Sequence, residues 1–396
     1  MINRYRLQTN KLYLLMEVYY LKINYSLIGL GGIAKIHLMA LKNMPFLDLQ
    51  KNNQINFTGL LTTNKKKNYN YAHSLGFKNI VESLDDLFKI PKLDMVDICT
   101  PNYLHKEQLL TSIKYNKNVY CEKPLALSSK EGKVILEALN NKNLYNQMGF
   151  VLRFLPTVLY TRSIIDNNLL GKIYAIRGEI YHSSYLKSNK KITWRLKKDK
   201  SGGGALADLG SHIIDLFHFL LGDIETVQAF TETIIKKRPT EDGDIKRVDV
   251  DDWALLMLKF KAGIKGTLEA SRVAVGKEGT RVEIYGEKGS VIIDTKNPYY
   301  PKFIDKNSRV VYIDDMLLEK DEEISELFKM YPNPKLSQGF MVDAHTASLA
   351  CFISSIINNR KNAYLPDFKE GYKAQKVIDY AYISSTNGGI PIFIEY

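Results

Sequence analysis

Residues 25–37 read YSLIGLGGIAKIH, a short apolar run that leads straight into the pattern Gly-x-Gly-x-x-Ala. The run predicts a buried strand, and the apolar spacing after it predicts a helix. In such a strand–turn–helix unit Gly29 permits the tight turn and Gly31 lets the backbone approach a pyrophosphate. Ala34 allows close packing of helix on strand. The positive helix N-terminus would face the phosphates. The stretch therefore predicts the first unit of a dinucleotide-binding domain.

The sequence around this stretch continues the same alternation. Apolar strand-like runs and helical patterns follow one another from about residue 22 to residue 149. This alternation predicts a doubly wound parallel α/β sheet, a Rossmann domain. Strands are expected at 23–28, 55–61, 95–99, 118–121 and 145–148.

Residues 150–396 have a different pattern. Strand-like runs follow one another without intervening helices between about residues 227 and 294. This predicts an α+β domain with a large, open, mixed or antiparallel sheet. Helices expected near 343–358 and 372–386 would pack back on the Rossmann domain. Residues 297–337 contain Tyr-Tyr-Pro and Pro-Asn-Pro and are interpreted as a surface excursion or a lid.

Lys123 follows a predicted strand and precedes Pro124. Ligands of open α/β sheets bind at the carboxyl ends of the strands, so this lysine is expected in the ligand cleft. Its alternative role, a solvated surface lysine, is disfavoured by the fingerprint upstream.

Residues 207–215, ADLGSHIID, follow the glycine run 202–204 and open an apolar stretch. Helical spacing would place Asp208, His212 and Asp215 on one face. A carboxylate one turn from a histidine can orient the imidazole for acid–base chemistry. We therefore expect Asp208 to orient His212, and Asp215 to make a hydrogen bond on the helix face.

Together these segments resemble the Gfo/Idh/MocA family of oxidoreductases. The resemblance rests on Glu-Lys-Pro at 122–124 after the fingerprint, and on Gly-Gly-Gly-x-x-x-Asp-x-Gly-x-His-x-x-Asp from residue 202. It covers almost all of residues 22–396 and leaves residues 1–21 as an extension without an expected function. The motifs are specific to the family but not to one substrate.

The resemblance implies site residues. Lys123, Asp208 and His212 are expected to be catalytic and, with Arg153, to contact substrate. Whether Lys123 or His212 takes the proton stays open. The planar guanidinium of Arg195 could hold a cofactor phosphate or a substrate hydroxyl. The expected cofactor contacts are Gly29, Gly31, Gly32, Ile33, Ala34, Thr62, Thr63, Lys65, Thr100, Pro101, Asn102, His105, Glu122, Lys123, Trp194 and Arg195.

The end of the second expected strand bears on cofactor choice. NAD-preferring Rossmann proteins place an acidic residue there to bind the ribose 2′-hydroxyl. Here the strand is followed by Thr62, Thr63, Asn64 and the lysines 65–67. Lysines and hydroxyls suit a 2′-phosphate, so NADP(H) is favoured over NAD(H).

Composition narrows the remaining function classes. The net charge is +12, but the lysines are dispersed, so nucleic-acid binding is not expected. No apolar run is long enough to suggest a membrane helix. Three widely spaced cysteines suit a reducing cytoplasm and form no zinc motif. No metal is expected.

These observations predict a cytoplasmic NAD(P)-dependent oxidoreductase that acts on a sugar, cyclitol or polyol. Two alternatives stay open: a catalytically silent dinucleotide-binding regulator, and a glycosidase that oxidises and re-reduces its substrate through tightly held cofactor. Apolar residues at 255–258 suggest a sheet with two apolar faces, of which helices cover one. A homodimer or homotetramer is therefore expected.

Overall fold

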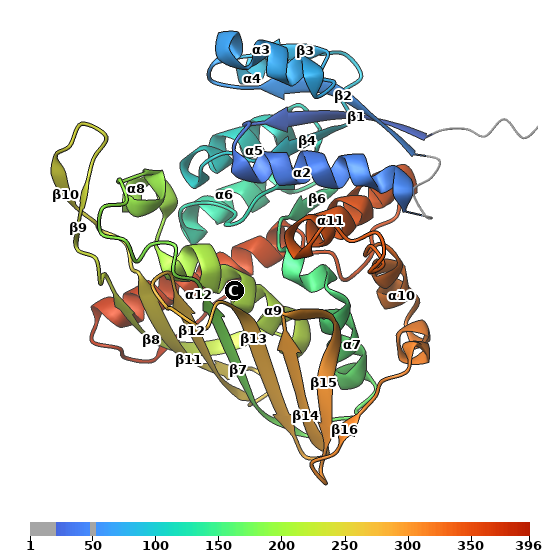
Figure 1. The fold of residues 1–396 in the computed structure, drawn as a ribbon, viewed down its shortest axis with the longest axis vertical. Helices are drawn as coiled ribbons and strands as arrows, with labels where there is room; N and C mark the ends of the chain where they lie inside the picture. Colours follow the sequence, from blue (N-terminus) through green and yellow to red (C-terminus); the bar gives the residue numbers. More distant parts are fainter. Residues whose placement is uncertain (1–20, 48–52) are drawn as a thin grey trace, which may run out of the picture.

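The computed structural model describes residues 21–47 and 53–396. The expected N-terminal extension therefore lies outside the described residues, except for Leu21, which begins the first strand. Figure 1 shows a Rossmann domain above a broad second sheet, with helices between them.

The first sheet has six parallel strands in the order β3-β2-β1-β4-β5-β6. This is the strand order of a dinucleotide-binding Rossmann fold, and it confirms the predicted fold class. The fingerprint joins the first strand to the first described helix. The elements are β1 (Leu21–Ile28), α2 (Gly32–Asn43), β2 (Asn53–Leu61), α3 (Lys65–Ser74), β3 (Asn79–Val81), α4 (Leu84–Phe88), β4 (Met95–Ile98), α5 (His105–Lys114), β5 (Asn118–Cys121), α6 (Ser129–Leu139) and β6 (Asn146–Met148).

The second sheet has nine strands in the order β16-β15-β14-β13-β7-β12-β11-β8-β17. Only the β7–β12 pair is parallel within this sheet, so the sheet is mixed as predicted. The strands are β7 (Ile173–Tyr181), β8 (Ile224–Glu232), β11 (Trp253–Phe260), β12 (Lys265–Ser271), β13 (Gly279–Gly286), β14 (Gly289–Asp294), β15 (Asn297–Asp305), β16 (Val310–Val311) and β17 (Ile392–Phe393).

Helices cover one face of this second sheet. A Cβ at Gly178 of β7 would lie 2.6 Å from Ile213 and 2.8 Å from Phe217, which shows how closely α9 (Ser211–Leu221) packs there. The C-terminal helices turn back toward the Rossmann domain, where α11 (Phe340–Ile357) packs on α2 and α12 (Phe368–Thr386) packs on α6 (Figure 1). The helices are α7 (Pro156–Asp166), α9 (Ser211–Leu221), α10 (Glu322–Lys329), α11 (Phe340–Ile357) and α12 (Phe368–Thr386).

The segment interpreted as a surface excursion, residues 297–337, instead extends the second sheet. β15 pairs with β14 and then with β16, and α10 follows. Pro298 and Pro301 did not prevent a strand because the β14–β15 register shifts beside them. The interpretation as a surface excursion was therefore wrong for the first part of the segment, residues 297–311, which contains β15 and β16.

Two helical stretches, residues 198–221 and 340–357, are long and apolar enough to cross a membrane by composition alone. In both, 78% of the apolar window is buried inside the fold. This is the behaviour of core helices.

Candidate active site

The glycines of the fingerprint build a cradle at the carboxyl end of β1. Gly29 has φ +91°, and a Cβ there would lie 2.9 Å from the carbonyl oxygen of Cys99. By contrast, a Cβ on Gly31 or Gly32 would meet nothing within 4 Å, so both glycines border open space. Within residues 21–47 and 53–396, no side chain caps the N-terminus of α2, so its first amides can bind an anion. These residues fit the diphosphate of a dinucleotide.

The residues expected to contact the ribose of the cofactor lie at the end of β2. Thr62 is buried and accepts a hydrogen bond from the Asn68 amide. Thr63 and Lys65 are exposed. Glu82, which follows β3, accepts a hydrogen bond from the backbone N–H of Lys65 at 3.0 Å. This carboxylate was missed because the short strand β3 was not predicted.

The loop after β4 is held by internal hydrogen bonds. The hydroxyl of Thr100 donates to Gln108 at 2.6 Å. The Nδ1 and Nε2 atoms of His105 lie 2.8 and 3.0 Å from the carbonyl oxygens of Pro124 and Thr100. His105 is fully buried, so it braces the loop around Pro101 rather than reaching a ligand. Asn102 donates to the carbonyl of Ser201 and ties this loop to the second domain.

Lys123 and Asp208 meet where the two domains face each other. The Nζ atom of Lys123 lies 2.8 Å from Oδ1 of Asp208 and 2.6 Å from its carbonyl oxygen. The other carboxylate oxygen accepts from Arg272 at 3.1 Å. Burial alone would raise the pKa of Asp208, but the charges of Lys123 and Arg272 outweigh it and hold that pKa well below its usual range. Arg272, absent from the predicted site, is thus part of this cluster.

The expected hydrogen bond between Asp208 and His212 is absent among the described residues. A π-type turn over Leu206–Gly210 replaces the regular helical turn assumed from the sequence, and the Asp208 carboxylate points to the two cations instead. The prediction that Asp208 orients His212 was therefore wrong.

His212 is the uncharged member of the site. Burial, followed by the charge of Lys123, lowers its pKa to about 3. Its Nδ1 is buried and has no hydrogen-bond partner among the described residues, and its ring packs against that of Phe150. A neutral imidazole at physiological pH can accept a proton.

Two further predicted residues have structural contacts. Arg153 is 4% exposed and makes a bidentate ion pair with Asp215, with N···O distances of 2.8 and 2.7 Å. It also contacts Glu370 at 3.1 Å. Burial raises the pKa of Asp215 to about 6 despite this arginine. Arg153 is thus committed to a buried ion pair and does not line the cleft.

Trp194 and Arg195 begin a short turn, Trp194–Leu196, before the glycine run. The Arg195 guanidinium is exposed and lies 4.3 Å from the Trp194 ring. The carbonyl of Arg195 accepts a hydrogen bond from Arg272 at 3.4 Å. The Arg195 guanidinium is therefore free to bind an anion near Asp208.

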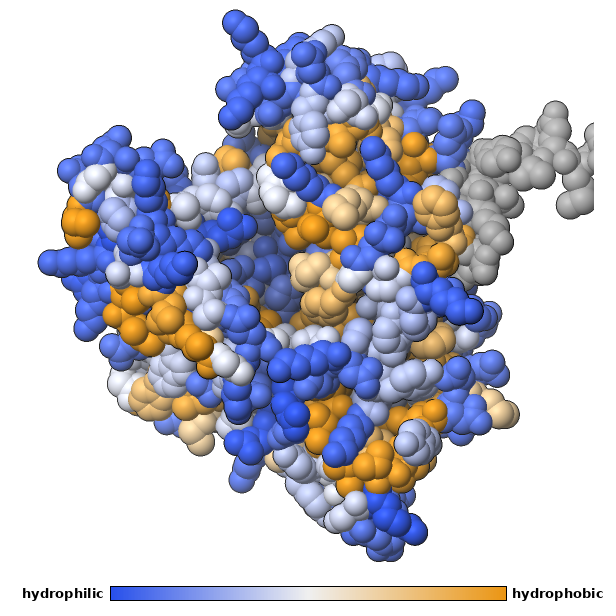
Figure 2. Space-filling model, viewed as in Figure 1, coloured by the Kyte–Doolittle hydropathy of each residue, from blue (hydrophilic) through white to orange (hydrophobic). Residues whose placement is uncertain are grey.

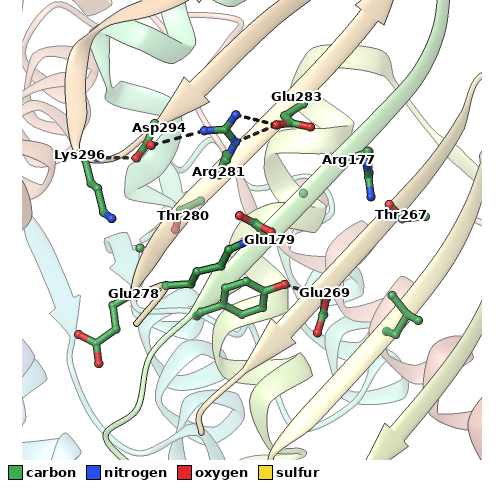
Figure 3. A pocket seen from close by; sticks show the side chains of 15 residues that line it. Arg177, Glu179, Thr267, Glu269, Glu278, Thr280, Arg281, Glu283, Asp294 and Lys296 are labelled. Carbon is green, nitrogen blue, oxygen red and sulfur yellow. Dashed lines mark hydrogen bonds and ion pairs between the residues drawn. The ribbon is translucent and has the colours of Figure 1, made fainter. Parts of the chain in front are cut away.

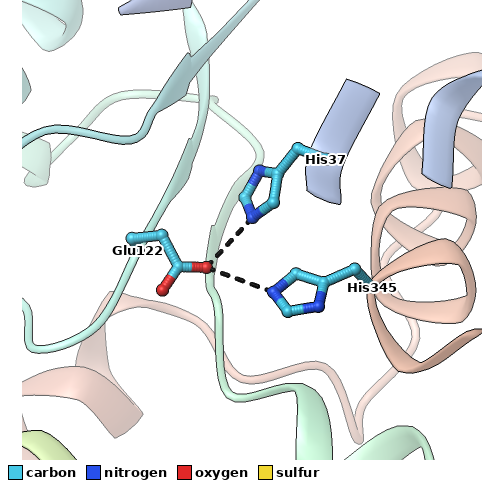
Figure 4. A group of neighbouring side chains, drawn as sticks. All are labelled: His37, Glu122 and His345. Atoms are coloured by element: carbon cyan, nitrogen blue, oxygen red, sulfur yellow. Dashed lines mark hydrogen bonds and ion pairs between the residues drawn. The ribbon is translucent and has the colours of Figure 1, made fainter. Parts of the chain in front are cut away.

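Glu122 lies behind the cleft, in a buried polar cluster with His37 of α2 and His345 of α11 (Figure 4). Its Oε1 atom is 3.1 Å from Nε2 of His37 and 3.5 Å from Nε2 of His345. The other nitrogen of His37 faces Asp97 at 2.8 Å. Burial opposes protonation of His37, but Asp97 outweighs it and raises the pKa of the imidazole. An imidazolium shared by two carboxylates fits these distances.

The three ligand-type atoms of this cluster lie within 4.8 Å of one another and could hold a metal ion. Sequence reasoning found no such grouping, because 85 residues separate His37 from Glu122 and α11 comes from the far end of the chain. The same contacts turn the Glu122 side chain away from the cleft in which it was expected to touch cofactor.

Figure 2 shows a deep, hydrophilic hollow between the Rossmann domain and the region of the hairpin β9 (Lys237–Pro239) and β10 (Ile245–Arg247). A separate hollow of 550 Å³ lies on the uncovered face of the second sheet (Figure 3). It is lined by charged side chains such as Arg177, Glu179 and Glu269 and contains none of the predicted catalytic residues.

A Rossmann domain that supplies open cradle glycines and Lys123, together with a second domain that supplies Asp208, Arg272 and a neutral histidine, defines a nicotinamide-dependent oxidoreductase. Residues 23–150 match the oxidoreductase family with an NAD-binding Rossmann fold, and residues 158–292 match the GFO/IDH/MocA C-terminal domain. The chain belongs to the Gfo/Idh/MocA family.

Individual relatives cover most of the chain. Levoglucosan dehydrogenase of Pseudarthrobacter phenanthrenivorans is 30% identical over 69% of this chain and 73% of its own length. Glucose-6-phosphate 3-dehydrogenase of Bacillus subtilis is 29% identical over 91% of this chain and 96% of its own length. A solved levoglucosan dehydrogenase with NADH and levoglucosan has a TM-score of 0.85 and 26% identity, covering 95% of this chain and 100% of that one.

Proposed function

We propose that the protein is an NAD(P)-dependent dehydrogenase or reductase that acts on a carbinol or ketone of a sugar, cyclitol or related polyol. The observation that carries this proposal is the Lys123–Asp208–Arg272 cluster beside neutral His212. Lys123 follows β5 at the same carboxyl edge of the parallel sheet as the glycine cradle after β1. The named activities of its relatives, on levoglucosan and on glucose 6-phosphate, support a sugar substrate.

The nicotinamide, when bound, supplies the hydride acceptor or donor. The Lys123 ammonium donates a hydrogen bond to the substrate oxygen and stabilises the developing alkoxide. Asp208 holds Lys123 in that position through the 2.8 Å contact, and Arg272 fixes Asp208 from the other side. The neutral imidazole of His212 accepts the hydroxyl proton, with Lys123 as the alternative base.

Two other functions would use the same fold. A silent regulator would bind dinucleotide without reducing it, and a redox-cycling glycosidase would cleave its substrate without net cofactor turnover. Screening sugars and polyols with both oxidised cofactors, while following reduced-nicotinamide absorbance and sugar hydrolysis, separates the three. We expect accumulation of reduced cofactor without hydrolysis, and hydrolysis without accumulation would overturn the proposal.

For the cofactor, we propose a preference for NADP(H). The exposed lysines 65–67 and Thr63 at the start of α3 support it, because they can surround a 2′-phosphate. Glu82 acts in the opposite direction, because a carboxylate near the ribose disfavours a second anion. The Glu82 carboxylate already accepts a hydrogen bond from the backbone N–H of Lys65, which limits this effect.

We also propose a cytoplasmic homodimer or homotetramer assembled through the uncovered face of the second sheet. Met257 of β11 is 53% exposed on that face, whereas its neighbours Leu256 and Leu258 point into the core. Light scattering at micromolar concentration tests this proposal, and a monomer under those conditions would contradict it.

A further inference from the structure

The loop between β7 and α8 (Lys198–Ser201) brings several cations to the catalytic cluster. Arg272 lies 3.1 Å from Asp208, and its guanidinium also lies 4.8 Å from the centroid of the Tyr185 ring. The Nζ atom of Lys190 lies 3.6 Å from the same centroid. Lys190 and Arg272 therefore both contact the Tyr185 ring.

Arg238, from the β9–β10 hairpin, fastens this loop. Its buried guanidinium donates to the carbonyl oxygen of Lys187 at 2.6 Å and to that of Tyr185. Lys190 itself donates to the carbonyl of Ser184 at 3.0 Å. These bonds hold Lys190 in a defined position, whereas a freely solvated surface lysine would have none.

Lys190, Arg195, Arg238 and Arg272 lie close enough to one another for their charges to interact, and together they form what we call the rim. Within the described residues, Lys190, Arg195 and Arg238 make no ion pair, and Asp208 is already shared by Lys123 and Arg272. Burial, followed by the charges of Arg238, Arg272 and Arg195, lowers the pKa of Lys190. Cations that crowd one another in a partly desolvated cleft are stabilised when an anion enters.

We propose that this rim, with Lys190 at its centre, binds an anionic group of the substrate, so that the physiological substrate is a sugar phosphate or a sugar acid. This inference rests on the proposed function. The diphosphate of the cofactor is the other possible anion, but its cradle lies at Gly31 and Gly32 in the Rossmann domain. The rim belongs to the second domain, beside Asp208.

A chain of contacts joins Lys190 to the catalytic cluster. Lys123 contacts Asp208, Asp208 contacts Arg272, and Arg272 and Lys190 both contact the Tyr185 ring. A substrate whose hydroxyl is held by Lys123 could therefore present an anionic group to Lys190. The rim therefore discriminates between charged and neutral sugars of the same shape, while the reacting groups do not.

The test compares matched pairs: glucose with glucose 6-phosphate, and glucose with glucuronate, each with both cofactors. We expect the anionic member of at least one pair to have a kcat/KM at least about tenfold higher, with a KM that rises with salt. Lys190→Ala should remove this advantage, so that the charged and neutral sugars of a pair have kcat/KM values within about twofold of each other. Lys190→Arg should retain much of it, and Lys191→Ala, an exposed neighbour, should change nothing.

Binding is measured separately from turnover. Thermal unfolding in the presence of NADH or NADPH should show stabilisation by the anionic sugar that Lys190→Ala removes. Equal kcat/KM for charged and neutral sugars would overturn the inference while leaving the oxidoreductase intact. Weaker binding of the dinucleotide to Lys190→Ala, with sugar selectivity unchanged, would overturn it by assigning the rim to the cofactor. A wild type that oxidises no sugar but is still stabilised by the anionic ones would instead overturn the proposed function alone.

Discussion

Glu122 and Lys123 are neighbours in the chain but belong to opposite kinds of polar cluster. Glu122 turns inward to His37 and His345, where its side chain is 10% exposed and those of the histidines are 0% and 2% exposed. Lys123 turns outward to Asp208, whose side chain is 28% exposed. The inner cluster is sealed, whereas the outer cluster borders the cleft.

The difference shows that two adjacent residues can serve separate purposes, with Glu122 pairing charges inside the core and Lys123 facing the cleft. In the inner cluster, Asp97 and Glu122 face the two nitrogens of one imidazole, so opposite charges are paired within the core. In the outer cluster, Lys123 and Arg272 share a single carboxylate and leave positive charge for a ligand. We therefore expect damage to the inner cluster to lower stability first, and damage to the outer cluster to lower turnover first.

Glu122→Ala should have the largest effect. Removing Glu122 from this buried ionic cluster takes away the carboxylate that His37 and His345 share, while Asp97 still faces His37. Loss of one partner of a buried ionic cluster costs about 3 to 5 kcal/mol in the free energy of unfolding. Denaturant unfolding measures this cost, with Lys123→Met as the matched variant one residue away. A Lys123→Met protein as unstable as Glu122→Ala would erase the distinction between the clusters.

Lys123→Met should reduce turnover at least about 100-fold, because the substrate oxygen loses its cationic hydrogen-bond donor. Binding of the dinucleotide, followed by nicotinamide fluorescence, should stay measurable. His212→Ala should reduce turnover to a similar extent. Near-normal turnover in either variant would remove that residue from the mechanism.

The Rossmann fold and the place of Lys123 at the cleft follow from sequence, but the division into two clusters and the pairing inside each do not. The fingerprint fixes local geometry, so β1, α2 and the open glycines were predictable. Contacts such as Glu122–His345 join distant elements and leave no local pattern. Asp208 was misassigned because a regular helix was assumed where a π-type turn lies. Strand β3, with three residues, is too short for its periodicity to be recognised.

The pH profile sharpens the comparison between His212 and Lys123 as the base. Because the pKa of His212 is about 3, this imidazole is already neutral at and above about pH 5. If His212 is the base, kcat/KM for oxidation should vary by less than about threefold between about pH 5 and pH 8. A steady rise toward alkaline pH, lost in Lys123→Met, would assign the base to Lys123 instead.

Cofactor choice should show the smallest effect. We expect a preference for NADP(H) of about tenfold or less in kcat/KM, which falls when Lys65, Lys66 and Lys67 are replaced by Ala. Thr62→Asp should move the preference toward NAD(H), and Glu82→Gln should move it further toward NADP(H). A wild-type preference for NAD(H) that the lysine replacements leave unchanged would contradict this assignment.

The most direct test of the central claim follows reduced-nicotinamide absorbance when wild type and Lys123→Met are mixed with oxidised cofactor and a set of sugars, sugar phosphates and polyols. Wild type should form one reduced cofactor for each carbinol oxidised. Lys123→Met should bind the same cofactor and reduce almost none of it. A wild type that binds the dinucleotide but reduces none with any member of the set would contradict the proposed dehydrogenase activity.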